Sequence, residues 1–61
     1  MMTREEMQTA IIHIYGFENP ITVNFFEVCA QLPQTPWADA ILEAAVKAHQ
    51  AHPNYGDKED E

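Results

Sequence analysis

Cysteine is almost absent from this chain, since Cys29 is the one cysteine among 61 residues. A disulfide within the chain is therefore excluded, although small domains often depend on disulfides, a metal or oligomerisation for their stability. We expect no signal peptide, and a lone cysteine without one points to a reducing compartment, so we expect a cytoplasmic protein. The apolar runs are only a few residues long, which is too short for a membrane-spanning segment.

Basic residues are scarce as well. Arg4, Lys47 and Lys58 stand against ten acidic residues, and the net charge is −7. Four of the acids and one lysine lie in residues 57–61, so this stretch carries −3 and the rest of the chain carries −4. Nucleic-acid binders present a basic patch to the phosphates, and anionic membrane surfaces repel an acidic chain. We therefore expect neither direct nucleic-acid binding nor membrane binding.

The positions of capping residues predict where helices begin and end. The Thr3 side chain can accept a hydrogen bond from the Glu6 amide while Glu6 reaches back to the Thr3 amide, which is a capping box. Gly16 is well placed to end this helix, because a residue without a Cβ adopts a left-handed conformation without a clash. Asn19-Pro20 and Thr35-Pro36 are each typical of an N-cap followed by proline at the first helical position. These signals predict helices over residues 4–15, 20–32 and 36–50.

The second of these segments carries conflicting signals. Residues 21–25 are rich in β-branched side chains and loosely alternating, which favours a strand. Apolar residues nevertheless keep helical spacing from Ile21 to Leu32, so we expect a helix. The fold prediction is an all-α, compact three-helix domain, orthogonal or bundle-like, over residues 1–56. A short acidic tail, residues 57–61, is expected to be disordered because it has no apolar side chain to offset the entropy of ordering.

Helical periodicity also selects a candidate core. On the third helix it places Trp37 and Ile41 on the inner face with several alanines, and Asp39, Glu43 and Lys47 on the outer face. The other two helices each show an apolar stripe at the same spacing. We expect these side chains to be buried: Ile11, Ile14, Phe25, Val28, Leu32, Trp37 and Ile41.

No motif in the chain carries recognisable catalytic, cofactor or metal chemistry. Cys29 lies late in a helix on its most apolar face, where a thiol behaves as a small hydrophobe. His49 and His52 are spaced i, i+3, but a structural zinc site needs four ligands, normally with paired cysteines. A three-helix domain of this size rarely encloses a ligand pocket. We therefore expect no enzyme, and no catalytic, cofactor-binding or metal-binding residues.

A second apolar flank points to function. Its members lie beside the stripes that one three-helix core needs, and they are Val23 and Phe26 on the second helix and Leu42 and Val46 on the third. One alternative is that these side chains pack within the domain, with the second helix at its centre. The other is that they bind a protein partner or a second copy, because contiguous exposed apolar patches mark interaction sites. The second alternative predicts a small, non-catalytic protein-interaction or regulatory module.

Two other functions are open at this point. An acidic inhibitor that mimics DNA would block a nucleic-acid-binding partner, and it needs carboxylates arrayed along one face. The candidates for that array are Glu5, Glu6, Glu18, Asp39 and Glu43. A helix-turn-helix DNA binder would need a basic stripe on the third helix, whose outer face instead offers two carboxylates and one lysine.

Overall fold

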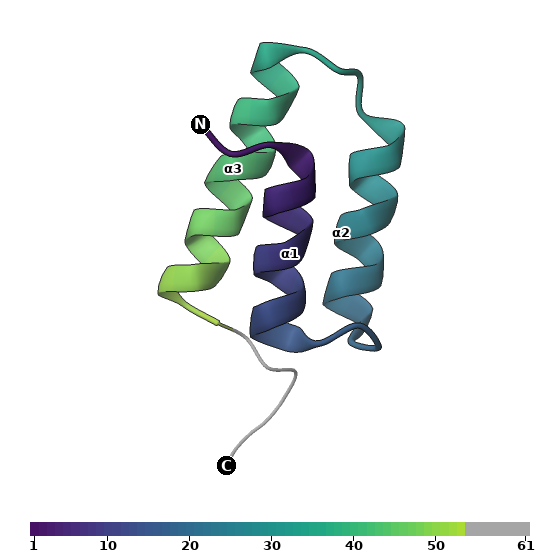
Figure 1. Ribbon diagram of the computed structural model, residues 1–61, viewed down its shortest axis with the longest axis vertical. Helices are drawn as coiled ribbons and strands as arrows, with labels where there is room; N and C mark the ends of the chain where they lie inside the picture. The colour runs from purple at the N-terminus through teal and green to yellow at the C-terminus, as the bar shows by residue number, and fades with distance from the viewer. Residues whose placement is uncertain (54–61) are drawn as a thin grey trace.

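The computed structural model describes residues 1–53, which form three helices: α1 (Arg4–Tyr15), α2 (Pro20–Gln31) and α3 (Pro36–Ala51) (Figure 1). The predicted all-α, three-helix fold is confirmed, and each boundary lies within one residue of its expected position. Residues 21–25 are helical, so the strand alternative is wrong. The expected tail, residues 57–61, lies outside the described residues. Among the described residues, no helix has both the length and the apolar character needed to cross a membrane.

The capping interactions expected from the sequence are present at all three helix starts. The Glu6 N–H donates to Thr3 Oγ1 at 3.1 Å, and the Thr3 N–H donates to Glu6 Oε1 at 2.9 Å. Asn19 Oδ1 accepts the first free N–H of α2, and Thr35 Oγ1 accepts one of α3. Each bond satisfies a backbone donor that has no partner within its helix, so the boundaries follow from local interactions alone.

Gly16 ends α1 in a conformation that other residues rarely adopt. Its φ of 87° and ψ of 166° lie in a region that is almost exclusive to glycine. In this conformation its N–H donates to the Ile12 carbonyl at 2.7 Å, and its carbonyl accepts from Thr22 Oγ1 at 2.6 Å. Thr22 is buried in α2, so the glycine directs the chain from α1 into the start of α2.

Replacing Gly16 with alanine is expected to lower the free energy of unfolding by about 1–3 kcal/mol, the usual cost of this backbone region for a residue with a side chain. A Cβ at this position would meet no atom within 4 Å, so the loss would come from the backbone and not from a clash. Urea unfolding followed by circular dichroism measures the effect. A variant as stable as the parent would show that the connection relaxes without cost.

The central helix of the bundle is α1. It packs against both α2 and α3, whereas few residues of α2 and α3 approach each other. Figure 1 shows the helices running alternately down, up and down, with α1 between the other two in this view. The interpretation that placed the second helix at the centre is therefore wrong. Because α2 and α3 both pack against α1 but make few contacts with each other, an open seam is left between them.

The core lies between α1 and its two neighbours. Two of the expected core residues, Ile11 and Phe25, are buried, and Ile14, Val28 and Leu32 are partly buried against them. The buried apolar side chains of the main cluster are Met7, Ile11, Phe25, Cys29, Leu42 and Val46. Leu42 and Val46, which the sequence placed on a flank, therefore belong to the core.

The core prediction is wrong for α3 at two positions. Trp37 and Ile41 are 58% and 56% exposed, while Leu42 and Val46 are 2% and 0% exposed. A shift of one residue turns the inner face by about 100°. The reason lies outside the helix itself: Arg4 of α1 binds Asp39, so the Asp39 side of α3 is drawn toward α1. Trp37 lies two residues before Asp39, about 200° around the helix, and so points away from α1.

Candidate interaction surface

An apolar groove of about 220 Å³ lies between α2 and α3. Its apolar lining comes from both helices and consists of Ile21, Phe25, Val28, Ile41, Leu42 and Ala45; Asn24 and His49 are its polar members. Phe25 and Leu42 are buried core residues, whereas Ile21 and Val28 are half-buried and Ile41 is exposed. The groove therefore opens the hydrophobic core toward the surface along the seam between α2 and α3.

The groove continues onto an exposed face of α3 that we call the α3 stripe, formed by Trp37, Ile41, Ala44 and Ala48. All four residues are exposed. Their spacing of four, three and four residues places them in one line along the helix, as in the seam of a coiled coil. A shallow hollow of about 340 Å³ borders the stripe at Ala44. The stripe thus has large side chains in its first half and small ones in its second.

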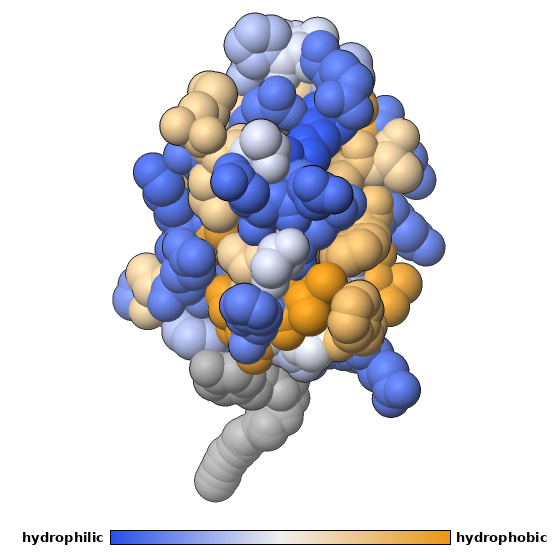
Figure 2. All heavy atoms as spheres, viewed as in Figure 1, coloured by the Kyte–Doolittle hydropathy of each residue, from blue (hydrophilic) through white to orange (hydrophobic). Residues whose placement is uncertain are grey.

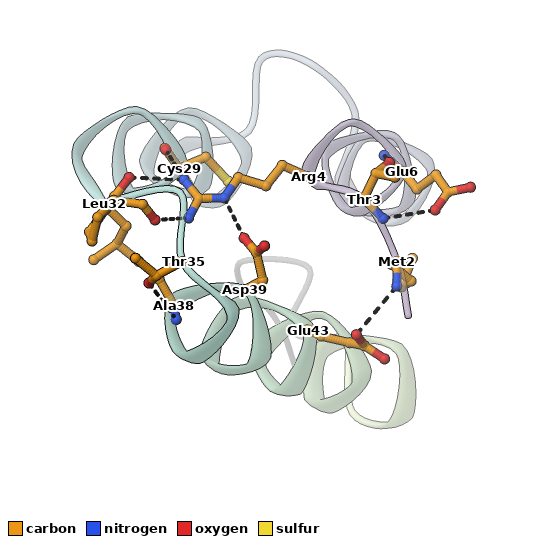
Figure 3. Close-up of polar contacts among 11 residues, drawn as sticks. Met2, Thr3, Arg4, Glu6, Cys29, Leu32, Thr35, Ala38, Asp39 and Glu43 are labelled. Atoms are coloured by element: carbon orange, nitrogen blue, oxygen red, sulfur yellow. Dashed lines mark hydrogen bonds and ion pairs between the residues drawn. The ribbon is translucent and has the colours of Figure 1, made fainter.

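Arg4 positions both walls of the groove at one end. Its Nη1 donates to the carbonyls of Cys29 and Leu32 at 2.8 and 3.0 Å, and its Nη2 donates to the Pro33 carbonyl (Figure 3). Its Nε forms an ion pair with Asp39 Oδ1 at 2.7 Å. Pro33 has no N–H, so the Cys29 carbonyl has no helical donor, and the guanidinium takes that place. One side chain of α1 therefore caps the end of α2 and holds the start of α3.

Tyr15 and His49 connect α1 to α3 near the other end. The Tyr15 hydroxyl and His49 Nδ1 form a hydrogen bond of 2.8 Å, and the two rings meet edge to face with their centroids 5.4 Å apart. Thr22 holds the start of α2 against the end of α1 through its bond to the Gly16 carbonyl. Both walls of the groove are therefore fixed to α1.

The carboxylates proposed for a DNA-like array are divided among different tasks and places. Asp39 pairs with Arg4, and Glu43 Oε2 lies 3.2 Å from Lys47 Nζ. Hydrogen bonds from Lys47 and from the Met2 N–H hold the pKa of the Glu43 carboxyl below its ordinary value. Glu18 lies in the connection after α1, at the opposite end of that helix from Glu5 and Glu6. Two of these five carboxylates are thus neutralised by partners, and the others do not share one helix face.

The structure separates the four residues of the expected protein-binding flank. Leu42 and Val46 are in the core, Phe26 is half-buried, and Val23 is exposed on α2. The premise that the four form one exposed surface is therefore wrong. Some apolar surface does remain near the connection between α1 and α2, where Phe17 and Val23 are exposed. Figure 2 shows apolar atoms gathered toward this lower end of the molecule.

The exposed positions that sequence reasoning missed are Trp37 and Ile41. The signal for them was present in the sequence, because the third helix has apolar residues around most of its girth. A helix that is apolar over so much of its surface cannot bury all of that surface in a three-helix core, so one apolar face stays exposed. Helical periodicity alone could not show which face of α3 packs against α1.

Cys29 and the histidines show no arrangement typical of catalysis or metal binding. Cys29 is buried, and burial raises the pKa of its thiol, an effect that the nearby Arg4 guanidinium partly opposes. His49 is hydrogen-bonded to Tyr15. Within residues 1–53, no group of three or more His, Cys, Asp or Glu side chains could hold a metal ion. The expectation of no catalytic, cofactor or metal site stays a prediction.

No protein-family model matches the chain, and neither a curated protein nor a solved structure was found to match it. The surface chemistry of the described residues is therefore the basis for a functional proposal.

Proposed function

We propose that this protein is a small, non-catalytic protein-interaction module that binds a helix with the α3 stripe and the groove between α2 and α3. The observation that carries the proposal is the exposure of Trp37 and Ile41 beside an apolar groove. Exposed apolar area is unfavourable by about 25 cal/mol per Å², so covering these side chains favours association. Aromatic residues with aliphatic neighbours are also typical of the centres of protein interfaces.

The shape of the surface favours a helical partner. An amphipathic helix laid into a groove places its apolar side chains at helical spacing, and the stripe itself has the four-three-four spacing at which two helices interlock. Both walls are held by α1 through Arg4 and Thr22, so the site is formed before the partner arrives. A preformed site loses less conformational entropy on binding.

The two other functions are less well supported. A DNA mimic needs an array of free carboxylates, but Asp39 and Glu43 are paired with Arg4 and Lys47. A helix-turn-helix protein needs cations on its recognition helix to meet phosphates. The exposed side of α3 carries one lysine, Lys47, and it is paired with Glu43.

Site-specific photocrosslinking tests the proposal. A photoreactive phenylalanine analogue at position 41 is expected to form a discrete protein adduct in a lysate of the source cells, because this position lies on the stripe. The same analogue at Glu27, which is exposed on α2, serves as the matched control and is expected to form none. Excess unlabelled protein should compete for the adduct, whereas excess Ile41→Asp protein should not. Equal labelling at both positions, or none at position 41, would refute the proposal.

A further inference from the structure

We infer that the partner helix is α3 of a second copy of this chain, and that the two α3 helices pair antiparallel through their stripes. This inference rests on the proposed function, because it assigns an occupant to the same surface. The proposal commits to one register, in which Trp37 of one copy lies against Ala48 of the other and Ile41 lies against Ala44.

The distribution of side-chain size along the stripe supports this register. The two large residues, Trp37 and Ile41, come first, and the two small ones, Ala44 and Ala48, come last. An antiparallel pair brings each large residue opposite a small one at all four positions. A parallel pair would instead set Trp37 against Trp37 and Ala48 against Ala48, so one end would be crowded and the other would be empty. The hollow beside Ala44, which Met1, Ala40, Glu43 and Lys47 also line, leaves room next to the position that Ile41 of the other copy would meet.

A dimer of this chain would need a contact face wider than the stripe alone. A specific interface takes about 800 Å² from each partner, which is about a fifth of the 4024 Å² surface of this chain. The stripe on one helix of about 24 Å is too narrow to supply this area. The groove adds the Ile21 and Val28 side of α2, so the face becomes two helices wide. α1 packs on the opposite side of α3 and does not obstruct the approach.

Charge argues for a second copy over a basic protein. The chain carries −7, yet the four residues of the stripe are uncharged. Asp39 is paired with Arg4, and Glu43, which lines the hollow beside Ala44, is paired with Lys47. Two copies can therefore meet at the stripe without burying an unpaired carboxylate. A basic partner would make its most favourable electrostatic interactions with the exposed acids and few with this uncharged face. Because the two copies repel each other at long range, salt should strengthen the dimer, whereas it would weaken binding of a basic partner.

Sedimentation equilibrium of the full chain tests the inference. We expect a monomer–dimer equilibrium that tightens between low and high salt, and Ile41→Asp should weaken dimerisation at least ~100-fold by placing a carboxylate in an apolar interface. Val23→Asp is the matched control, because it adds the same charge at an exposed apolar position off the stripe, and it should dimerise as the parent does. Ala44→Asp provides a second stripe variant should Ile41→Asp fail to fold by circular dichroism.

Disulfide trapping tests the direction of the pair. In an equal mixture of Trp37→Cys and Ala48→Cys proteins, the antiparallel register predicts disulfides between the two variants. Disulfides between two copies of the same variant should be rare, since the same position on the two α3 helices would lie about 16 Å apart along the helix axis. A predominance of disulfides within the Ala48→Cys variant would overturn the antiparallel arrangement.

The two proposals can fail separately. A chain that stays monomeric to ~1 mM while the photoadduct at position 41 persists would overturn the second copy as the occupant and leave the interaction function standing. A monomeric chain without that adduct would overturn both.

Discussion

Replacing Phe25 with alanine is expected to lower the free energy of unfolding by about 3–5 kcal/mol, from the lost transfer free energy and the cavity left behind. Phe25 is 7% exposed and packs in the cluster that joins all three helices. A domain of this length has a total stability near the low end of about 5–15 kcal/mol, so this loss is a large share of it. The change should leave much of the chain unfolded under mild denaturant.

Phe17→Ala is the matched control for this prediction, since it deletes the same side chain at a position that is 70% exposed. Its effect should stay within about 0.5 kcal/mol, as is usual for surface substitutions. Urea unfolding of both variants at one low protein concentration keeps any self-association from biasing the comparison. If the two variants have the same midpoint, the assignment of Phe25 to the core is wrong.

Replacing Arg4 with alanine is expected to lower the free energy of unfolding by about 3 kcal/mol, which is unusual for a charged residue near a chain end. The Arg4 side chain is only 12% exposed, and its guanidinium reaches the carbonyls at the end of α2 as well as Asp39. Without it, the Cys29 carbonyl has no helical donor and a partly buried carboxylate has no cation. Arg4→Lys should recover only part of the loss, because an ammonium cannot donate in the planar, forked geometry of a guanidinium.

Lys47→Ala provides the control for the Arg4 prediction. Lys47 also pairs with a carboxylate, but its side chain is largely exposed and the pair lies within one helix, so little change in stability is expected. A double-mutant cycle with Arg4→Ala and Asp39→Ala separates the ion pair from the bonds to carbonyls. An Arg4→Ala protein with the parental unfolding midpoint would contradict the role assigned to this side chain.

The contacts of Arg4 could not be predicted from the sequence. The contacts join Arg4 to residues 25 to 35 positions further along the chain. A pattern of local spacing carries no information on such pairs. The sequence showed an arginine in the first turn of a helix and a proline after the second helix, but only the packed structure shows that the first compensates for the missing N–H of the second.

The helices themselves were determined by the sequence. Thr3 with Glu6, Asn19 with Pro20, Thr35 with Pro36, and Gly16 act on their own neighbours within a few residues, so their effects could be predicted without knowledge of the rest of the chain. Local capping outweighed the β-branched character of residues 21–25, and all three helices begin where it predicts.

Only the tertiary structure decided which face of α3 is buried. Leu42 with Val46 and Trp37 with Ile41 are both apolar pairs at helical spacing, and alanines surround them, so periodicity allowed either pair to face inward. The Arg4–Asp39 pair lies on the side of Leu42 and Val46 and turns that side toward α1. The orientation of α3, and with it the exposure of the stripe and the position of the groove, therefore depends on an interaction between helices that local sequence cannot specify.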